Sequence, residues 1–224
     1  MLIGGSSNSG RKRTLALLLL SIVALISKLS TAQQLKVRDS KVSNGEKAST
    51  NEFPFIVSLQ QADDISAKSY SHTCGASIIN SKYLLSAAHC FSPPDTLPWI
   101  AVYGGNSVSD VQRKYIKIKN IHVHPQYSDS NNNVVNDIAI LELESAMTLD
   151  GKTAKAAYLE IGSIPIGFSS IVAGWGTTVD TQPLPTDLMK VTVPVVDMSK
   201  CNAINLDASS PKQICAGDGK GHDR

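Results

Sequence analysis

One histidine of this chain stands where the sequence would hold a proton-transfer residue firmly in place. His89 ends the apolar, strand-like run at residues 84–88 and is followed directly by Cys90. A strand before the histidine and a disulfide beside it would fix the position of its ring. Proton transfer works only within hydrogen-bond reach of the reacting group, so a general base needs that kind of fixation. His89 is therefore the first candidate for acid–base chemistry, with a structural histidine as the simpler alternative.

Two further stretches fit the same interpretation. Asp137 opens the apolar run at residues 138–141, and Ala173 is followed by Gly174-Trp175-Gly176. Together with the Ala-Ala-His-Cys sequence around His89, these stretches resemble the trypsin-like serine peptidases of the chymotrypsin fold. That family orders its catalytic residues histidine, aspartate, serine along the chain.

The resemblance implies a role for each residue of the pair. His89 is expected to take the proton of a serine hydroxyl and later to deliver it to the leaving amine. Asp137 is expected to fix the tautomer of the imidazole and to stabilise the imidazolium; otherwise, an aspartate at a strand start is a turn residue. Residues 1–224 hold no serine in a Gly-Asp-Ser-Gly-Gly setting. We therefore expect the chain to stop before the catalytic serine and to be inactive as it stands.

Asp223 is the candidate for the base of the substrate pocket. Trypsin-like relatives place an aspartate a few residues after a Cys-Ala-Gly turn, where its carboxylate selects Lys or Arg by charge pairing. Gly221-His222-Asp223 fits that position, although Arg224 follows where the family has Ser-Cys. Asp218, in the preceding glycine-rich loop, is the alternative.

The N-terminal residues are predicted to be a secretory signal peptide over residues 1–32. Arg11-Lys12-Arg13 precedes an apolar run at residues 15–26, and small residues follow at Ser30 and Ala32. An uncleaved membrane anchor is the alternative. A helix of about twelve residues is roughly 18 Å long, however, which is short of a hydrocarbon core of roughly 30 Å.

Residues 33–41 are polar and charged and are predicted to form a short propeptide. Lys41 and Val42 then resemble the activation site of the family, where cleavage after a basic residue frees a small apolar N-terminus. The usual Ile-Val-Gly-Gly stands here as Val42-Ser43-Asn44-Gly45. A flexible surface segment is the alternative, because four residues specify little.

The cysteines indicate disulfides, since an even number of them, four, follows a signal peptide. Four cysteines can pair in three ways. The resemblance implies the two sequence-local pairs, Cys74–Cys90 and Cys201–Cys215. A zinc site is the alternative, but no Cys-x-x-Cys pair occurs. His122 and His124 have no carboxylate or third histidine at a matching spacing, so we predict neither a metal site nor a cofactor.

The remaining pattern is one of short strands separated by turns. Apolar or alternating segments cover residues 53–59, 76–79, 83–87, 100–103, 116–119, 138–143, 170–173 and 188–193. Such segments predict an all-β barrel or sandwich. His72, near the second segment, either resembles a family position close to the catalytic end of the first barrel or is an ordinary strand histidine. Residues 63–68 and 129–133 are predicted to be polar loops. A short helix is predicted to begin within residues 197–201, with Asp197 or Ser199 as its N-cap.

The resemblance implies that these strands form two antiparallel Greek-key β-barrels of the chymotrypsin type, of which the second is incomplete. We expect the first barrel at residues 42–144, a connection at residues 145–165 and the partial second barrel at residues 166–224.

Composition suits a globular protein, with 42% apolar and 18% charged residues. The net charge of +2 depends on residues 1–32, which hold four basic and no acidic side chains, so nothing indicates a nucleic-acid partner.

We expect a secreted, extracellular, monomeric serine endopeptidase, free of the membrane after signal cleavage, that hydrolyses protein or peptide substrates after Lys or Arg. A non-catalytic secreted homologue that binds a protein partner is the alternative. A carbohydrate-binding β-protein is a weaker one, since two Trp and six Tyr offer no visible aromatic platform.

Overall fold

The computed structural model describes residues 45–91, 96–110, 113–130, 133–176, 185–202, 213–217 and 219. All of them fall within one compact unit, Asp39–Arg224. The predicted signal peptide and propeptide, the activation residues Lys41 and Val42, and Asp223 lie outside the described residues. No helix in the described ranges is long and apolar enough to cross a lipid bilayer.

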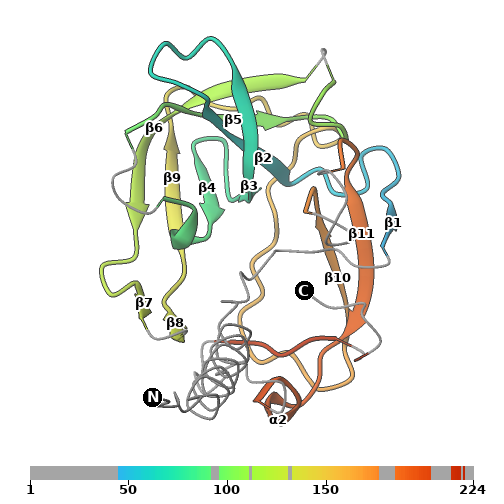
Figure 1. The fold of residues 1–224 in the computed structure, drawn as a ribbon. Coiled ribbons are helices and arrows are strands. Elements are labelled where there is room, and N and C mark those ends of the chain that lie inside the picture. Colours follow the sequence, from blue (N-terminus) through green and yellow to red (C-terminus); the bar gives the residue numbers. More distant parts are fainter. Residues whose placement is uncertain are drawn as a thin grey trace, which may run out of the picture. The chain divides into compact units, whose positions relative to one another are not determined.

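Six strands close into a barrel in the order β2-β3-β4-β9-β6-β5 (Figure 1). They are β2 (Ile56–Ala62), β3 (Tyr70–Ile78), β4 (Tyr83–Ser86), β5 (Trp99–Tyr103), β6 (Lys114–Val123) and β9 (Ala139–Leu143). Every neighbouring pair in the barrel is antiparallel. Closure removes the exposed strand edges that an open sheet would present to other chains.

The interior of this barrel is filled by branched aliphatic side chains from alternating strand positions. The members with no exposed surface are Val57, Leu59, Ile78, Leu84, Leu141 and Leu143. Each such side chain contributes roughly 1.5–3 kcal/mol through burial relative to an exposed position. The core therefore holds in place the strands that lead to the candidate site.

Strand β2 is buried on both faces, which simple alternation does not predict. Val57 and Leu59 point into the barrel, yet Ser58 and Gln60 on the opposite face are also buried. Gln60 stands opposite His72 of β3. The ring of His72 meets Trp175 of the second half at a centroid distance of 5.5 Å. The outer face of β2 and β3 therefore packs against the second half of the protein.

The second half contributes a three-stranded sheet in the order β1-β11-β10 (Figure 1). Its strands are β1 (Glu46–Lys47), β10 (Ser169–Gly174) and β11 (Met189–Pro194). This partial sheet beside a closed barrel confirms the predicted all-β class. Strand β1 was not foreseen here, because it belongs to the N-terminal part of the sequence. The Lys190 ammonium of β11 fastens that part by ion pairs to Glu52 at 2.7 Å and Glu46 at 3.4 Å.

Two local predictions are corrected by the structure. The Phe53-Pro54-Phe55 segment is a turn and not the start of a strand, since the Ile56 N–H donates to the Phe53 carbonyl at 3.1 Å. Proline after the first residue favours such a turn because its ring fixes φ. The segment 129–133, predicted as a loop, contributes to the hairpin of β7 (Ser128–Ser130) and β8 (Asn133–Val135). Val134, which follows the polar segment, has a high strand propensity and is paired with Asp129.

Short polar motifs shape the connections between strands. The Asp150 carboxylate accepts N–H groups of residues 152–154, and these bonds, with the Thr153 hydroxyl first, lower the pKa of Asp150. Asp197 accepts the Ser199 N–H at 2.9 Å and caps the short helix α2 (Met198–Asn202). The helix thus begins where the sequence predicts.

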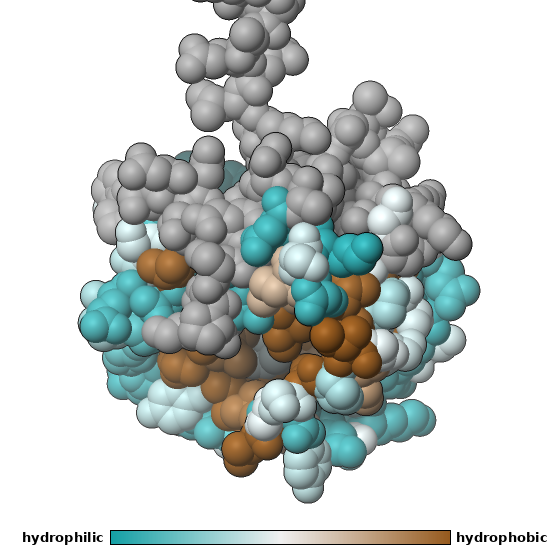
Figure 2. Space-filling model, turned by 90° about the horizontal axis from the view of Figure 1, so that it is seen from below, coloured by the Kyte–Doolittle hydropathy of each residue, from teal (hydrophilic) through white to brown (hydrophobic). Residues whose placement is uncertain are grey.

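Large apolar side chains remain exposed in the second half and the connection to it. The most exposed are Tyr158, Ile161, Ile166 and Ile214, with exposed fractions between 61% and 99%. Figure 2 shows one face of the molecule on which apolar side chains gather. Within the described residues, the second sheet is therefore not enclosed as the first barrel is.

Candidate active site

His89 lies in a short 3₁₀ helix, η1 (Ala88–Phe91), that follows the end of β4. Ala88 and Phe91 on either side of it are buried in the barrel core. The Phe91 ring meets the Trp99 ring edge-on at 5.1 Å. Two buried anchors thus fix the turn, while the His89 side chain keeps 56% of its surface exposed.

Asp137 reaches the histidine because β4 and β9 are neighbours. Ser86, near the end of β4, is paired with Ala139, at the start of β9. The residue before the aspartate, Asn136, adopts a left-handed φ of 54° and donates through its side chain to the Gln126 carbonyl at 2.8 Å. Asparagine tolerates this conformation better than most residues. The local turn therefore aims Asp137 back toward η1.

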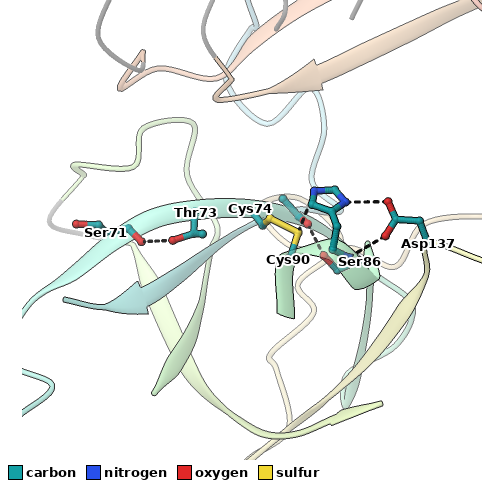
Figure 3. The surroundings of a disulfide bond; sticks show 8 residues. Ser71, Thr73, Cys74, Ser86, Cys90 and Asp137 are labelled. Atoms are coloured by element: carbon teal, nitrogen blue, oxygen red, sulfur yellow. Dashed lines mark hydrogen bonds and ion pairs between the residues drawn. A yellow bond between two sulfur atoms is a disulfide. The ribbon is translucent and has the colours of Figure 1, made fainter. Parts of the chain in front are cut away.

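Both carboxylate oxygens of Asp137 bond to the same histidine. Oδ2 lies 2.8 Å from the ring nitrogen Nδ1, and Oδ1 accepts the His89 backbone N–H at 2.8 Å. Figure 3 shows the two dashed contacts that leave Asp137, close to the Cys74–Cys90 disulfide. An ionised carboxylate only accepts hydrogen bonds, so the ring proton lies on Nδ1 and the lone pair on Nε2. The pair can thus take up a proton at Nε2.

Two disulfides tie neighbouring segments together. Cys74 of β3 is bonded to Cys90 of η1 with a Cα–Cα distance of 6.3 Å, and Cys201 to Cys215 with 6.0 Å. The first disulfide lies directly beside the candidate base, since Cys90 Sγ is 3.7 Å from His89 Nε2. Ser86 adds a hydrogen bond from Oγ to the Gly75 carbonyl at 2.8 Å, a contact that sequence inspection did not single out.

His72 is held by contacts of its own between the two halves. Its Nδ1 is hydrogen-bonded to Ser58 Oγ at 2.8 Å, and its ring packs against Trp175. Burial lowers the pKa of His72 to about 4, because an imidazolium there would lose its hydration. The residue is therefore neutral at ordinary pH and part of the packing between the halves. The Trp175 indole also donates to the Asn106 carbonyl at 3.0 Å.

Comparison with known proteins indicates the same class of protein as the geometry of the site. The family model described as Trypsin matches residues 42–224. Chymotrypsin-like elastase family member 1 of Macaca fascicularis is 29% identical over 190 residues, covering 84% of this chain and 70% of that protein. Trypsin of Simulium vittatum is 30% identical over 182 residues, covering 80% and 71%.

A solved structure shares the fold. It is that of neuropsin, a serine protease expressed in the limbic system of mouse brain, with a TM-score of 0.69 and 23% identity. The similarity covers 80% of this chain and 75% of that one. The fold and the carboxylate-held histidine thus define a serine protease scaffold of the chymotrypsin type. The chain belongs to the trypsin family.

Proposed function

We propose that this protein is a secreted serine endopeptidase in which His89 is the general base and Asp137 orients it. The observation that carries the proposal is the pair of hydrogen bonds that Asp137 accepts from one histidine, both at 2.8 Å. These two hydrogen bonds support a proton on Nδ1 and a lone pair on Nε2 of a side chain that is 56% exposed, as serine activation requires. Family membership supports hydrolysis of protein substrates.

The finer parts of the proposal rest on the sequence. Cleavage after Lys41 would free Val42 as the new N-terminus of the active form. Asp223 at the base of the substrate pocket would select Lys or Arg through charge pairing. The nucleophile is a serine that residues 1–224 do not show in a Gly-Asp-Ser-Gly-Gly setting, so the proposal includes such a serine after Arg224.

The first test uses the coding sequence downstream of Arg224. A segment that encodes Ser-Cys-x-Gly-Asp-Ser-Gly-Gly supports the endopeptidase. A stop codon with no such segment in any spliced transcript contradicts it and favours a non-catalytic homologue that binds a protein partner.

The second test is kinetic. Residues 42–224 are joined to a trypsin-family C-terminal segment that carries the serine, and turnover of an arginyl amide substrate is measured. We expect activity that His89→Ala abolishes and that Asp137→Asn lowers by roughly 10⁴-fold in kcat. His122→Ala, which changes an exposed histidine of β6, is the matched control and should leave turnover unchanged. Residues 42–224 without the added segment should show no turnover, because they supply no nucleophile.

Substrate preference is tested in the same chimera. Asp223→Ala should reduce kcat/KM for arginyl substrates far more than for alanyl ones, whereas Asp218→Asn should not. Equal losses on both substrates after Asp223→Ala would contradict the assignment of Asp223 to the pocket.

A further inference from the structure

A surface groove of about 540 Å³ lies between the turn at residues 51–55 and the connection that joins the two halves. Phe55, Ala156 and Tyr158 are among the residues that line it. Its volume is within the range of ligand-binding pockets in proteins. Neither residue of the candidate catalytic pair lines it, so the groove is separate from the candidate active site.

Two cations line the groove without an opposite charge to pair with. Lys152 and Lys155 are exposed, and neither ammonium group has an ion pair or hydrogen bond within the part of the chain that the structure describes. The third charged lining residue, Glu52, is already engaged. Its carboxylate is paired with the Lys190 ammonium at 2.7 Å and accepts the Ser49 N–H at 2.8 Å. The groove therefore presents positive charge, and the ligand that complements it is an anion.

Both walls of the groove are held in place by contacts of their own. The Asp150 carboxylate accepts the backbone N–H groups of Lys152 at 2.9 Å and of Ala154 at 3.0 Å, and Ala154 has no exposed surface. On the other wall, the rings of Phe53 and Phe55 meet edge-on at 6.2 Å. The groove is thus formed before a ligand arrives, which reduces the entropy that binding has to overcome.

The connection between the halves leaves one edge of its backbone unpaired at the groove. The N–H groups of Lys155 and Ala157 donate to carbonyl oxygens of the N-terminal half at 3.0 Å and 2.8 Å. This alternate spacing is that of an extended chain paired along one edge. The N–H groups of Ala156 and Tyr158, which lie on the opposite edge, donate to no other described residue. An extended peptide can therefore pair with this edge as an added strand.

We propose that this groove binds an extended acidic peptide segment of a partner protein. The peptide pairs with the outward edge of residues 155–158, and its carboxylates lie beside Lys152 and Lys155. An apolar side chain of the peptide packs between Phe55 and the ring of Tyr158, a residue that is 99% exposed. Residues 33–41 of this chain do not match the groove in charge, because they carry three basic side chains and one acidic side chain.

The test measures the fluorescence anisotropy of labelled peptides with the purified full-length protein. The probe is Asp-Glu-Phe-Glu-Asp-Leu, and its basic counterpart has Lys in place of each acidic residue. We expect the acidic probe to bind one-to-one, with an affinity that falls as the salt concentration rises, and the basic counterpart not to bind. A copy of the acidic probe with N-methylated backbone amides keeps every side chain. It should lose most of the binding, because it cannot donate hydrogen bonds as an added strand.

Two double variants separate the groove from general attraction to basic side chains. Lys152→Glu with Lys155→Glu should weaken binding of the acidic probe by at least about tenfold, since two attractions become two repulsions. Lys114→Glu with Lys117→Glu changes two exposed lysines of β6 and gives the same net charge. This matched control should keep the affinity within about twofold, because distant exposed charges are screened. Circular dichroism checks that both variants keep their β-structure.

Four results would overturn the proposal. They are the absence of saturable binding, equal losses in the two double variants, full binding of the N-methylated probe, and tighter binding of another ligand. The other ligands compared are a synthetic peptide of residues 33–41 and a sulfated polysaccharide. Tighter binding of the first would mean that the groove takes a segment of this chain, and tighter binding of the second would mean that it recognises an anion without a peptide backbone.

Discussion

Replacing His72 by glutamine should remove a defined part of the sensitivity of this fold to acid. His72 packs against Trp175 and is hydrogen-bonded to Ser58, and burial lowers its pKa from 6.5 to about 4. Between these two values the unfolded chain binds a proton that the folded chain does not. The free energy of unfolding must therefore fall as the pH drops from 6.5 toward 4 and must be unaffected by His72 above that range.

The size of this effect follows from the same pKa values. One pKa unit corresponds to about 1.4 kcal/mol, so the change from 6.5 to about 4 is worth at most about 3 kcal/mol for this half-buried ring. Denaturant unfolding at about pH 7 and at about pH 4 measures it as the difference between the two free energies. Unaltered protein should lose more stability over this interval than His72→Gln does. Carboxylates that titrate in the same range cancel, because both proteins carry them.

The matched control for this experiment is His122→Gln, which changes an exposed histidine of β6 and should keep the pH dependence of the unaltered protein. An identical loss of stability in His72→Gln and in the unaltered protein would refute the reasoning. It would mean that His72 binds a proton as readily in the folded protein as in the unfolded chain.

Three other predictions concern the core, the cysteines and the N-terminus. Leu84→Ala should lower the free energy of unfolding by about 2–5 kcal/mol in denaturant titration, because it leaves a cavity at a position with no exposed surface; a loss below about 1 kcal/mol would contradict the packing of the barrel. Non-reducing peptide mapping should recover only the two local disulfides, and a peptide that joins the two halves would contradict them. The pairs are Cys74–Cys90 and Cys201–Cys215. Secreted material should begin at Gln33, or at Val42 after activation, whereas intact Met1 in a membrane fraction would count against signal cleavage.

Much of the first barrel could be predicted from the sequence, because its strands carry local signals. Alternating or continuous apolar segments lie at β4, β5 and β9, and turn residues separate them. The Ala-Ala-His-Cys motif likewise marked His89, and the Asp-Ile-Ala-Ile-Leu run marked Asp137. Their contact in space follows from the pairing of β4 with β9, which no local pattern encodes.

Other features escaped prediction for the same physical reason. The burial of Ser58 and Gln60 is not evident from their polar side chains; Ser58 is hydrogen-bonded to His72, whose ring packs against Trp175 of the second half. The second bond of Asp137, to the backbone of His89, requires a turn geometry that residue types alone do not specify. The closeness of Cys74 to His89 likewise depends on β3 folding back beside β4.

The pairing of β1 with β11 sets an order of events during synthesis. Every strand of the barrel lies between Ile56 and Leu143, so the barrel can close while the second half is still being made. Glu46 and Lys47, which leave the ribosome before any barrel strand, find their partners only when Met189 and Lys190 have appeared. Contacts of such long sequence separation form slowly, because the entropy of closing the long loop is lost before the contact contributes any stabilisation. Strand β1, the first of the described strands to be synthesised, is therefore expected to be among the last to find its partner.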